Sequence, residues 1–197
     1  MPDADIIILS WGRIGDTLDA IRSALDQDGA DISVIVVDQG SEPESLTRLS
    51  DYCVQRSEVR LIANARNVGV PGGRNQGAAA GGSETIIILD NDAVFASPQC
   101  VRRAVERLRS QPEIGALSFA VECFDRLDGV ATPDLSSWVY GARNAVEWWR
   151  KCFQERKFVG VGAALRRSAF EEVGGFDPGL FFLHEEEDLS ERLINRG

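Results

Sequence analysis

The sequence has little of several features that mark particular classes of protein. Lysine occurs only twice, at Lys151 and Lys157, and the formal net charge is −10. Because a chain this acidic repels polyanions, an extended nucleic-acid surface is excluded. No apolar run approaches the length of about 18 residues that a membrane span requires. The N-terminus has no charged segment followed by a long apolar one, so we expect a cytoplasmic protein without an integral membrane segment.

Cysteine pairs and the common nucleotide-binding motifs are also missing. The four cysteines, Cys53, Cys100, Cys123 and Cys152, form no C-x-x-C pair and no zinc-binding spacing, which indicates reduced thiols. The P-loop pattern G-x-x-x-x-G-K-[ST] does not occur, and no G-x-G-x-x-G follows the first predicted strand. These absences argue against a P-loop nucleotidase and against a dinucleotide-dependent oxidoreductase.

What the sequence does contain is an alternation of strand and helix patterns. The 197 residues are enough for one domain with a sizeable core. Short apolar runs predict strands, and apolar residues at i, i+3 and i+7 predict the helices between them. The order is β-α-β-α-β, for which a parallel sheet with right-handed crossovers is the economical topology. The predicted elements are strands at Asp5–Leu9, Ile32–Val37 and Val59–Ala63, and helices at Ile14–Gln27 and from Ser41 or Glu42 onward.

A fourth strand carries the most informative polar residues. Ile86–Leu89 is a short apolar run typical of a strand buried on both faces, and Asp90, Asn91 and Asp92 follow it. In an open α/β sheet ligands bind at this end of the strands, and paired carboxylates there suit a hard cation that neutralises a diphosphate. A solvated turn that caps the strand is the alternative interpretation.

The residues 64–82 contain six glycines and predict a helix entered through a glycine-rich loop. Gly72 and Gly73 allow a close approach, either of the sheet to the helix or of a nucleotide to the backbone. Arg66 and Arg74 flank the loop, and arginine is shaped for bidentate contacts to phosphate. Both interpretations of the glycines remain open at this stage.

The second half of the chain predicts strands at Ile114–Phe124 and Phe158–Leu165 around an irregular segment, Asp125–Glu155. The aromatic residues of that segment belong either to the core or to an acceptor pocket. The acidic residues 185–188 follow His184, the only histidine. They suit the first turn of a helix, where the dipole favours negative charge, and they also suit a general base with its basicity raised by mutual repulsion.

Taken in order, six segments resemble family 2 glycosyltransferases: SWGR, VIVVDQGS, NVGVPGGRNQGAAA, IIILDND, GVGAALRRSAFEEVGGFDPGLFF and HEEEDLSERL. The resemblance implies the GT-A fold, a single α/β domain with a Rossmann-like, mostly parallel sheet flanked by helices. Residues of about 1–97 would bind the nucleotide and about 98–197 would hold the acceptor and the catalytic base. The implied activity is inverting transfer from a nucleotide-diphosphate sugar, a UDP- or dTDP-sugar, to a glycan, lipid or other hydroxyl acceptor. Peripheral membrane contact is compatible with it.

The resemblance also implies the donor-binding residues. Ser10 and Trp11 would border the base, Asp38 would hydrogen-bond it, Arg74 would contact the nucleotide-sugar, and Asp90 would face the ribose. Asp92, with Asp90 beside it, would hold a divalent cation, Mn²⁺ or Mg²⁺.

On the acceptor side, the resemblance implies Glu186 as catalytic base, at a position where the family has aspartate. Glu185 and Asp188 would lie near the acceptor as alternative bases. Gly162 and Ala163 would lie beneath the donor sugar and the acceptor.

Two departures and two rival functions accompany this prediction. Glu186 is one methylene longer than the family's aspartate. The chain stops at Gly197, where family members usually continue with a segment that closes the site, so it is either a fragment or an enzyme without that segment. A truncated or degenerate domain that binds a nucleotide without catalysis is one rival. The other is a sugar-nucleotide pyrophosphorylase, which would carry a glycine-rich phosphate loop with arginine and lysine after its first strand, where this chain has SWGRIG without a lysine.

Overall fold

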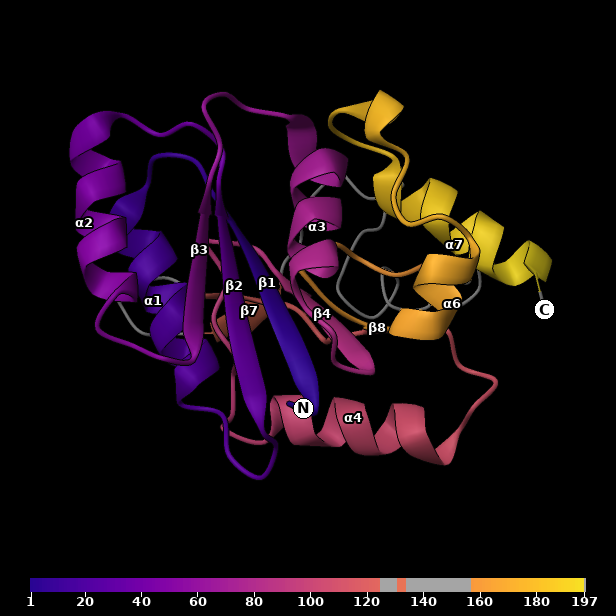
Figure 1. The fold of residues 1–197 in the computed structure, drawn as a ribbon. Helices are drawn as coiled ribbons and strands as arrows, with labels where there is room; N and C mark the ends of the chain where they lie inside the picture. The colour runs from indigo at the N-terminus through magenta and orange to yellow at the C-terminus, as the bar shows by residue number, and fades with distance from the viewer. Residues whose placement is uncertain (125–130, 134–156, 197) are drawn as a thin grey trace.

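The computed structural model describes residues 1–124, 131–133 and 157–196 (Figure 1). Most of the irregular segment 125–155, with its tryptophans, lies outside the described residues, and so does Cys152. Whether those aromatic residues form core or an acceptor pocket therefore stays open.

A six-stranded sheet forms the centre of the fold, with the strand order β3-β2-β1-β4-β8-β5. Four of the strands are parallel, as the sequence predicts. They are β1 (Ala4–Ser10), β2 (Ile32–Asp38), β3 (Val59–Ala63) and β4 (Thr85–Leu89). The strand β8 (Gly162–Arg166) runs antiparallel to β4, and β5 (Ala116–Ser118) runs antiparallel to β8 at the sheet edge.

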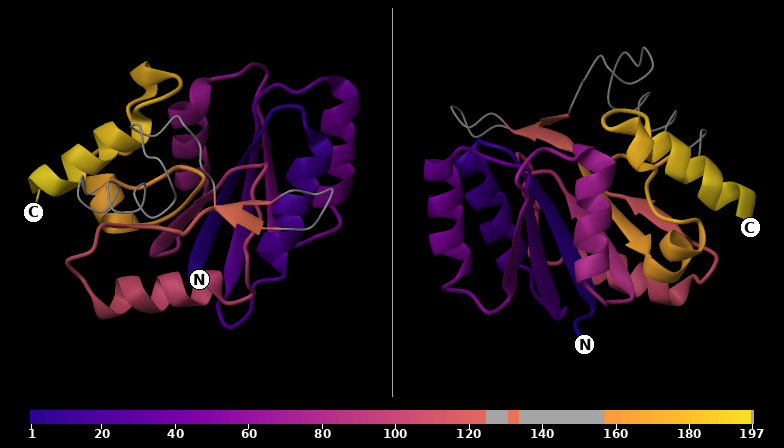
Figure 2. Two further views of the ribbon diagram at one scale, coloured as in Figure 1. Left: turned by 180° about the vertical axis from the view of Figure 1, so that it is seen from behind. Right: turned by 45° about the horizontal axis from the view of Figure 1, so that its top comes forward.

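Helices cover both faces of this sheet, because the central strands are apolar on both sides (Figures 1 and 2). Ile6 and Ile8 of β1 face α1, α2 and α4, whereas Ile7 faces α3, α6 and α7. All three isoleucines are at most 1% exposed, and each buried side chain of this size stabilises the fold by about 1.5–3 kcal/mol. The helices are α1 (Ile14–Leu25), α2 (Pro43–Cys53), α3 (Gly69–Ala80), α4 (Cys100–Ser110), α6 (Arg167–Glu172) and α7 (Glu185–Arg196), and a short 3₁₀ helix, η1 (Pro178–Leu180), precedes α7.

Two predicted strands differ from the structure. The single strand predicted over Ile114–Phe124 is wrong: β5 ends at Ser118, and β6 (Glu122–Phe124) pairs instead with β7 (Ala131–Pro133) in a separate two-stranded sheet. The strand predicted over Phe158–Leu165 is shorter, because β8 begins only at Gly162. The amide of Val159 donates to the side chain of Ser118 in β5 and not to the backbone of a strand, so the chain enters β8 as a loop.

The predicted fold class is confirmed: a mixed α/β domain with a mostly parallel sheet between two layers of helices. Within residues 1–124, 131–133 and 157–196, the helices are too short or too polar to cross a bilayer. The N-terminus lies beside α4, where Asp3 accepts a hydrogen bond from Arg109, and α7 carries the chain away from the sheet (Figure 2).

Candidate functional site

The carboxyl ends of β1, β2 and β4 meet at one edge of the sheet. Ser10 and Asp38 are paired in register at the ends of β1 and β2, and Asp90 follows β4 directly. The Ser10 side chain is buried, with its Oγ 3.4 Å from Thr17 Oγ1, so it faces the core. Trp11 projects from the next position and is 64% exposed. Ligands of open α/β sheets bind at this edge, and in this protein the edge carries the exposed aromatic ring of Trp11.

Asp38 shapes the loop that follows β2. Its Oδ2 accepts hydrogen bonds from the amides of Gly40 and Ser41 at 3.1 and 2.9 Å, and its Oδ1 accepts from Ser41 Oγ at 2.5 Å. The amide of Gly12 in turn donates to Ser41 Oγ at 2.9 Å. Asp38 therefore ties the loops after β1 and β2 together. A direct contact from its carboxylate to a nucleotide base stays a prediction.

The glycine-rich segment forms a helix packed tightly on the sheet. A Cβ on Gly73 would lie 2.2 Å from Gln39 Nε2, and one on Gly77 would lie 2.5 Å from Ile7 Cγ2. The N-terminus of α3 is closed by protein groups, since Val70 donates its amide to the carbonyl of Phe181 at 2.7 Å. Of the two interpretations of these glycines, helix packing is the one that the contacts support. Close packing also brings Arg74 beneath the edge of the sheet.

Arg74 is the centre of the site. It is 3% exposed, and its guanidinium reaches three carboxylates from two distant segments. Nη1 donates to Glu186 Oε1 at 2.6 Å and lies 3.6 Å from Glu185 Oε1. Nη2 donates to Asp90 Oδ1 at 3.3 Å and to the carbonyl of Gly160 at 3.2 Å. The structure therefore joins the end of β4 to the start of α7 through one buried cation.

The electrostatics of this cluster follow from its burial. Burial lowers the pKa of Arg74, but the facing carboxylates of Asp90 and Glu186 outweigh it and hold that pKa above its ordinary value. Burial raises the pKa of Glu185, and the neighbouring Glu186 raises it further. Burial also raises the pKa of Asp90 to about 6, although Arg74 opposes the change and the Asp90 side chain is 38% exposed. The cluster gathers more negative charge than its single cation neutralises.

Two buried polar atoms in this cluster have no hydrogen-bond partner in the described part of the chain. They are Arg74 Nε and Glu185 Oε2. A buried polar atom without a partner is costly, and it often marks a position completed by a ligand or water.

Gly160 makes room for the cluster. A Cβ at this position would lie 1.8 Å from Glu186 Oε1 and 2.7 Å from Arg74 Nη2. Gly162 and Ala163 pair with Leu89 and Ile88 of β4 and are buried in the sheet. Their predicted place beneath a donor sugar is not tested by these contacts. The sequence pattern F-V-G-V-G indicated close packing here but not against which residues.

Asp188 does not join the cluster. It accepts a hydrogen bond from Arg192 Nε at 2.9 Å, and Arg192 also donates to the carbonyl of Val173 at 2.7 Å. Asp188 thus faces α6. Of the three acidic residues singled out in this segment, the structure brings Glu185 and Glu186 to Arg74 and turns Asp188 away.

Asp92 lies at the open side of the same edge. Its Oδ2 is 2.8 Å from Nη1 of Arg13, which the sequence analysis did not select as a site residue. The only indication in the sequence was its place in SWGR. Arg13 is the N-cap residue immediately before α1 and is held in a left-handed backbone conformation with φ 43°.

The carboxylates fit a divalent cation that also takes oxygens from a ligand. No cluster of three or more histidine, cysteine, aspartate or glutamate side chains able to hold a metal occurs in the described residues. The Asp92 side chain is 46% exposed, so an ion could reach it, and its carboxylate lies 2.8 Å from the guanidinium of Arg13. Mg²⁺ and similar ions are commonly bound through one or two carboxylates and substrate phosphates. Asp90 and Asp92 are the carboxylates that could hold such an ion together with the phosphates of a ligand.

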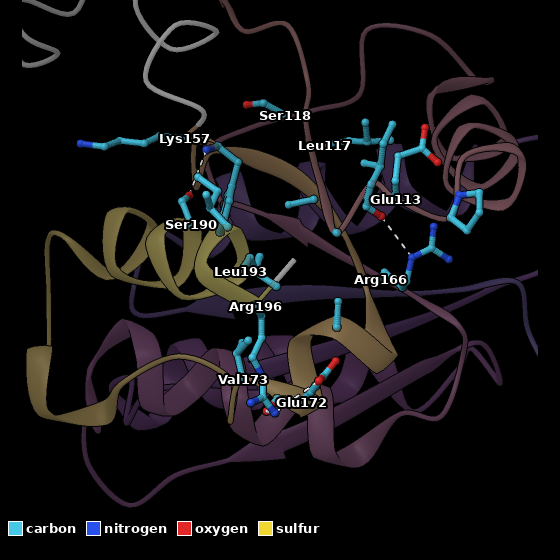
Figure 3. Close-up of a pocket in the computed structure, with 17 residues that line it drawn as sticks. Glu113, Leu117, Ser118, Lys157, Arg166, Glu172, Val173, Ser190, Leu193 and Arg196 are labelled. Carbon is cyan, nitrogen blue, oxygen red and sulfur yellow. Dashed lines mark hydrogen bonds and ion pairs between the residues drawn. The ribbon is translucent and has the colours of Figure 1, made fainter.

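A separate cavity lies between α7 and the β5 edge of the sheet (Figure 3). Its volume is about 1040 Å³. Leu117, Arg166 and Val173 line it together with Ser190 and Leu193 of α7. Its lining, taken from the described residues, includes none of the predicted donor, cation or base residues. The cavity is therefore distinct from the Arg74 cluster.

Comparison with known proteins agrees with the fold. Residues 5–174 match the sequence model of glycosyl transferase family 2. The chain is 34% identical over 107 residues to the succinoglycan biosynthesis protein ExoO of Rhizobium meliloti, covering 54% of the chain and 30% of that protein. It is 26% identical over 164 residues to a glucosyl-dolichyl phosphate glucuronosyltransferase of Haloferax volcanii, covering 81% and 50%.

Solved structures show the same architecture at low sequence identity. A mannosyltransferase of Pyrobaculum calidifontis, solved in complex with GDP-Man and Mn²⁺, superposes with a TM-score of 0.75 at 17% identity, over 100% of this chain and 53% of that one. TarS residues 1–349 of S. aureus give 0.70 at 13% identity, over 97% and 55%. These likenesses confirm the predicted GT-A fold. The chain spans about half the length of these proteins, and less of ExoO.

Proposed function

The chain belongs to glycosyl transferase family 2, and on that premise we propose that it transfers a sugar from a nucleoside-diphosphate donor to a hydroxyl acceptor with inversion at the anomeric carbon. The observation that carries the proposal is the buried Arg74, which joins Asp90 on the donor side to Glu186 on the acceptor side. Transfer of this kind needs stabilised charge on the leaving diphosphate and a base on the opposite face of the sugar. Asp90 would serve the first task through a divalent cation that it helps to hold, and Glu186 would serve the second.

On the donor side, Trp11 offers its exposed ring to the nucleotide base, while Asp38 and Ser10 hold the loops that form the base pocket. Asp90 and Asp92 would hold the divalent cation, Mn²⁺ or Mg²⁺. When bound, that cation supplies positive charge that stabilises the leaving diphosphate. The Pyrobaculum mannosyltransferase, with GDP-Man and Mn²⁺, supports this assignment.

On the acceptor side, Glu186 would accept the proton of the attacking hydroxyl. Arg74 binds one carboxylate oxygen, Oε1, and so fixes the orientation of the side chain while Oε2 is left for the acceptor. Positioning of this kind is a large part of what an active site contributes. A UDP- or dTDP-sugar donor and a glycan or lipid-linked acceptor remain the proposed substrates.

A domain that binds the nucleotide without transfer is the second candidate. The ion pair between Arg74 and Glu186 favours it, because a base bound at 2.6 Å by a guanidinium is less available to a proton. Donor turnover with and without candidate acceptors separates the two functions. Release of the free sugar or of a glycosylated acceptor supports the transferase, whereas nucleotide binding with no turnover of UDP-, dTDP- or GDP-sugars supports the binding domain.

We expect binding of a nucleoside diphosphate to depend on a divalent cation, because Asp90 and Asp92 would otherwise repel the phosphates. With Mn²⁺ present and the ligand at about 100 times its Kd, the melting temperature should rise by about 5–10 °C. Calorimetry with UDP, dTDP and GDP measures the affinity directly, and Asp92→Asn is the matched variant. Equal affinity in excess EDTA would exclude the cation from donor binding.

The raised pKa of Asp90 predicts a specific pH dependence of stability without ligand. The native pKa is about 6 and the ordinary value is 3.8, so the folded state favours the protonated carboxyl. The stability that this group contributes is fully present below the ordinary value and is lost as pH rises to about 6. The measurement compares the melting temperatures of the natural protein and of Asp90→Asn in EDTA from pH 4 to 7.5. As the pH rises, the natural protein should lose stability relative to the variant, and the difference between the two melting temperatures should become constant above pH 6. A constant difference throughout would contradict the raised pKa.

A further inference from the structure

Arg13 and Arg74 neutralise the two aspartates of the D-N-D segment in different ways. Arg74 is buried and fixed by Glu186 and Gly160 as well as by Asp90. Arg13 is 58% exposed and reaches Asp92 across the edge of the sheet from the start of α1, 79 residues away in sequence. Only the exposed arginine is able to leave its carboxylate without opening the core.

The turn that carries Arg13 is held in place by its surroundings. Gly12 and Arg13 both have positive φ, 63° and 43°, and this conformation is uncommon for a residue with a Cβ. The amide of Gly12 is bound to Ser41 Oγ, and the carbonyl of Arg13 accepts from the amide of Thr17 at 3.1 Å. An exposed ion pair stabilises a fold little, so the contact with Asp92 does not account for this strained turn. Backbone strain of this kind is concentrated at functional sites.

A second carboxylate keeps the Arg13 side chain at the site. Asp16, one turn into α1, lies 2.9 Å from both Nε and Nη2 of Arg13, whereas Asp92 takes Nη1. Release from Asp92 would therefore leave the guanidinium tethered by Asp16 near the carboxyl end of β4, with Nη1 free. That is a suitable place for a donor to phosphate oxygens.

From this geometry we propose that Arg13 is an exchangeable counter-ion, a donor-binding residue that occupies the cation position at Asp92 until the donor arrives. When a divalent cation binds at Asp92, the Arg13 guanidinium would leave that carboxylate and would bind the diphosphate. The inference rests on the proposed function for the identity of the ligand. Its first half, competition with the cation, is independent of any transfer activity.

The test measures binding of Mn²⁺ alone, by calorimetry or by the electron paramagnetic resonance of free Mn²⁺, to the natural protein and to Arg13→Gln. Removing the competing charge should tighten Mn²⁺ binding by roughly 1.5- to fivefold. The matched control is Arg22→Gln, on the same helix, which removes an exposed arginine with an i−3 ion pair to Asp19 at 2.7 Å and should leave the affinity unchanged. Asp92→Asn should weaken Mn²⁺ binding in either background.

A second measurement uses UDP and GDP with saturating Mn²⁺. Here Arg13→Gln should weaken binding by about tenfold, the loss expected for a charge-assisted contact to phosphate, while Arg13→Lys should retain part of the affinity. Effects of opposite sign on the two ligands are the diagnostic, because damage to the fold would weaken both. If Arg13→Gln binds Mn²⁺ no more tightly than Arg22→Gln does, the proposed exchange is wrong. If Arg13→Gln binds the nucleotide as tightly as the natural protein does, the proposed phosphate contact is wrong. If the protein binds no nucleotide at all, the proposed function fails, whereas tighter Mn²⁺ binding by Arg13→Gln would still establish the competition.

Discussion

Replacing Glu186 with glutamine is expected to lower the rate of sugar transfer by about 10²–10⁴-fold, the usual loss when a general base is removed. Glutamine keeps the size of the side chain and an oxygen for Arg74 Nη1, but it cannot accept the proton of the acceptor. Donor affinity should change little, because Asp90, Asp92 and Trp11 are untouched. Steady-state kinetics with a donor that the protein turns over measure the rate of transfer, and calorimetry with the nucleotide measures the donor affinity.

Two acidic neighbours provide the controls for this substitution. Asp188→Asn removes a carboxylate that faces Arg192 and α6, so transfer should be close to normal. Glu185→Gln changes a buried carboxyl that touches Arg74 but is 3% exposed, so its effect should be smaller than that of Glu186→Gln. Loss of transfer in Asp188→Asn with activity preserved in Glu186→Gln would show that the base has been assigned to the wrong residue.

Replacing Arg74 with methionine is expected to destabilise the protein by about 3–5 kcal/mol, the range for breaking a buried ion pair by removing one partner. Glu185 and Glu186 would be left facing each other without a cation, and the partial exposure of Asp90 puts the loss toward the lower end. The melting temperature should fall by roughly 6–20 °C. Thermal and urea unfolding measure this directly.

A double variant distinguishes electrostatics from simple loss of packing. Arg74→Met with Glu186→Gln removes the cation and one of its carboxylates together, so the two changes should destabilise less than the sum of the single effects. Arg22→Met, at an exposed arginine, is the control for replacing this residue type and should melt close to the natural protein. Melting of Arg74→Met at the same temperature as Arg22→Met would contradict the role of Arg74 as a buried counter-ion.

The sequence predicted the parallel half of the fold well because its features are local. Ile86–Leu89 identifies a strand from four consecutive apolar residues, and Asp90 and Asp92 are placed at its end by chain order alone. No local sequence pattern predicts that β8 pairs antiparallel with β4, because the direction of β8 depends on the path of the long segment that connects the two strands. The break in Ile114–Phe124 also depends on tertiary pairing, because β5 and β6 belong to different sheets.

The site was predicted in part, for similar physical reasons. Residue types at strand ends located Asp38, but only the folded loop shows its carboxylate bound to Gly40 and Ser41. Arg74 was predicted to contact the nucleotide-sugar, which stays a prediction, and its position beside three carboxylates could not be read from the sequence. Arg13 was missed, because its role depends on a left-handed turn that directs the side chain to a residue 79 positions away.

The placement of Arg74 has a consequence for how the chain is made. Its ion-pair partner Glu186 lies 112 residues later, so at a synthesis rate of about 5–20 residues per second roughly 6–20 s separate the two. During that interval Asp90 is the only one of its three carboxylates already synthesised. A nascent chain with β1–β4 assembled would thus have to bury a guanidinium whose Nη1 lacks its carboxylate partners in order to dock α3. We expect α3 to stay loosely attached until α7 arrives, leaving Ile7 and Ile88 open to chaperones and proteases, so that the contact at the centre of the candidate site also completes the fold.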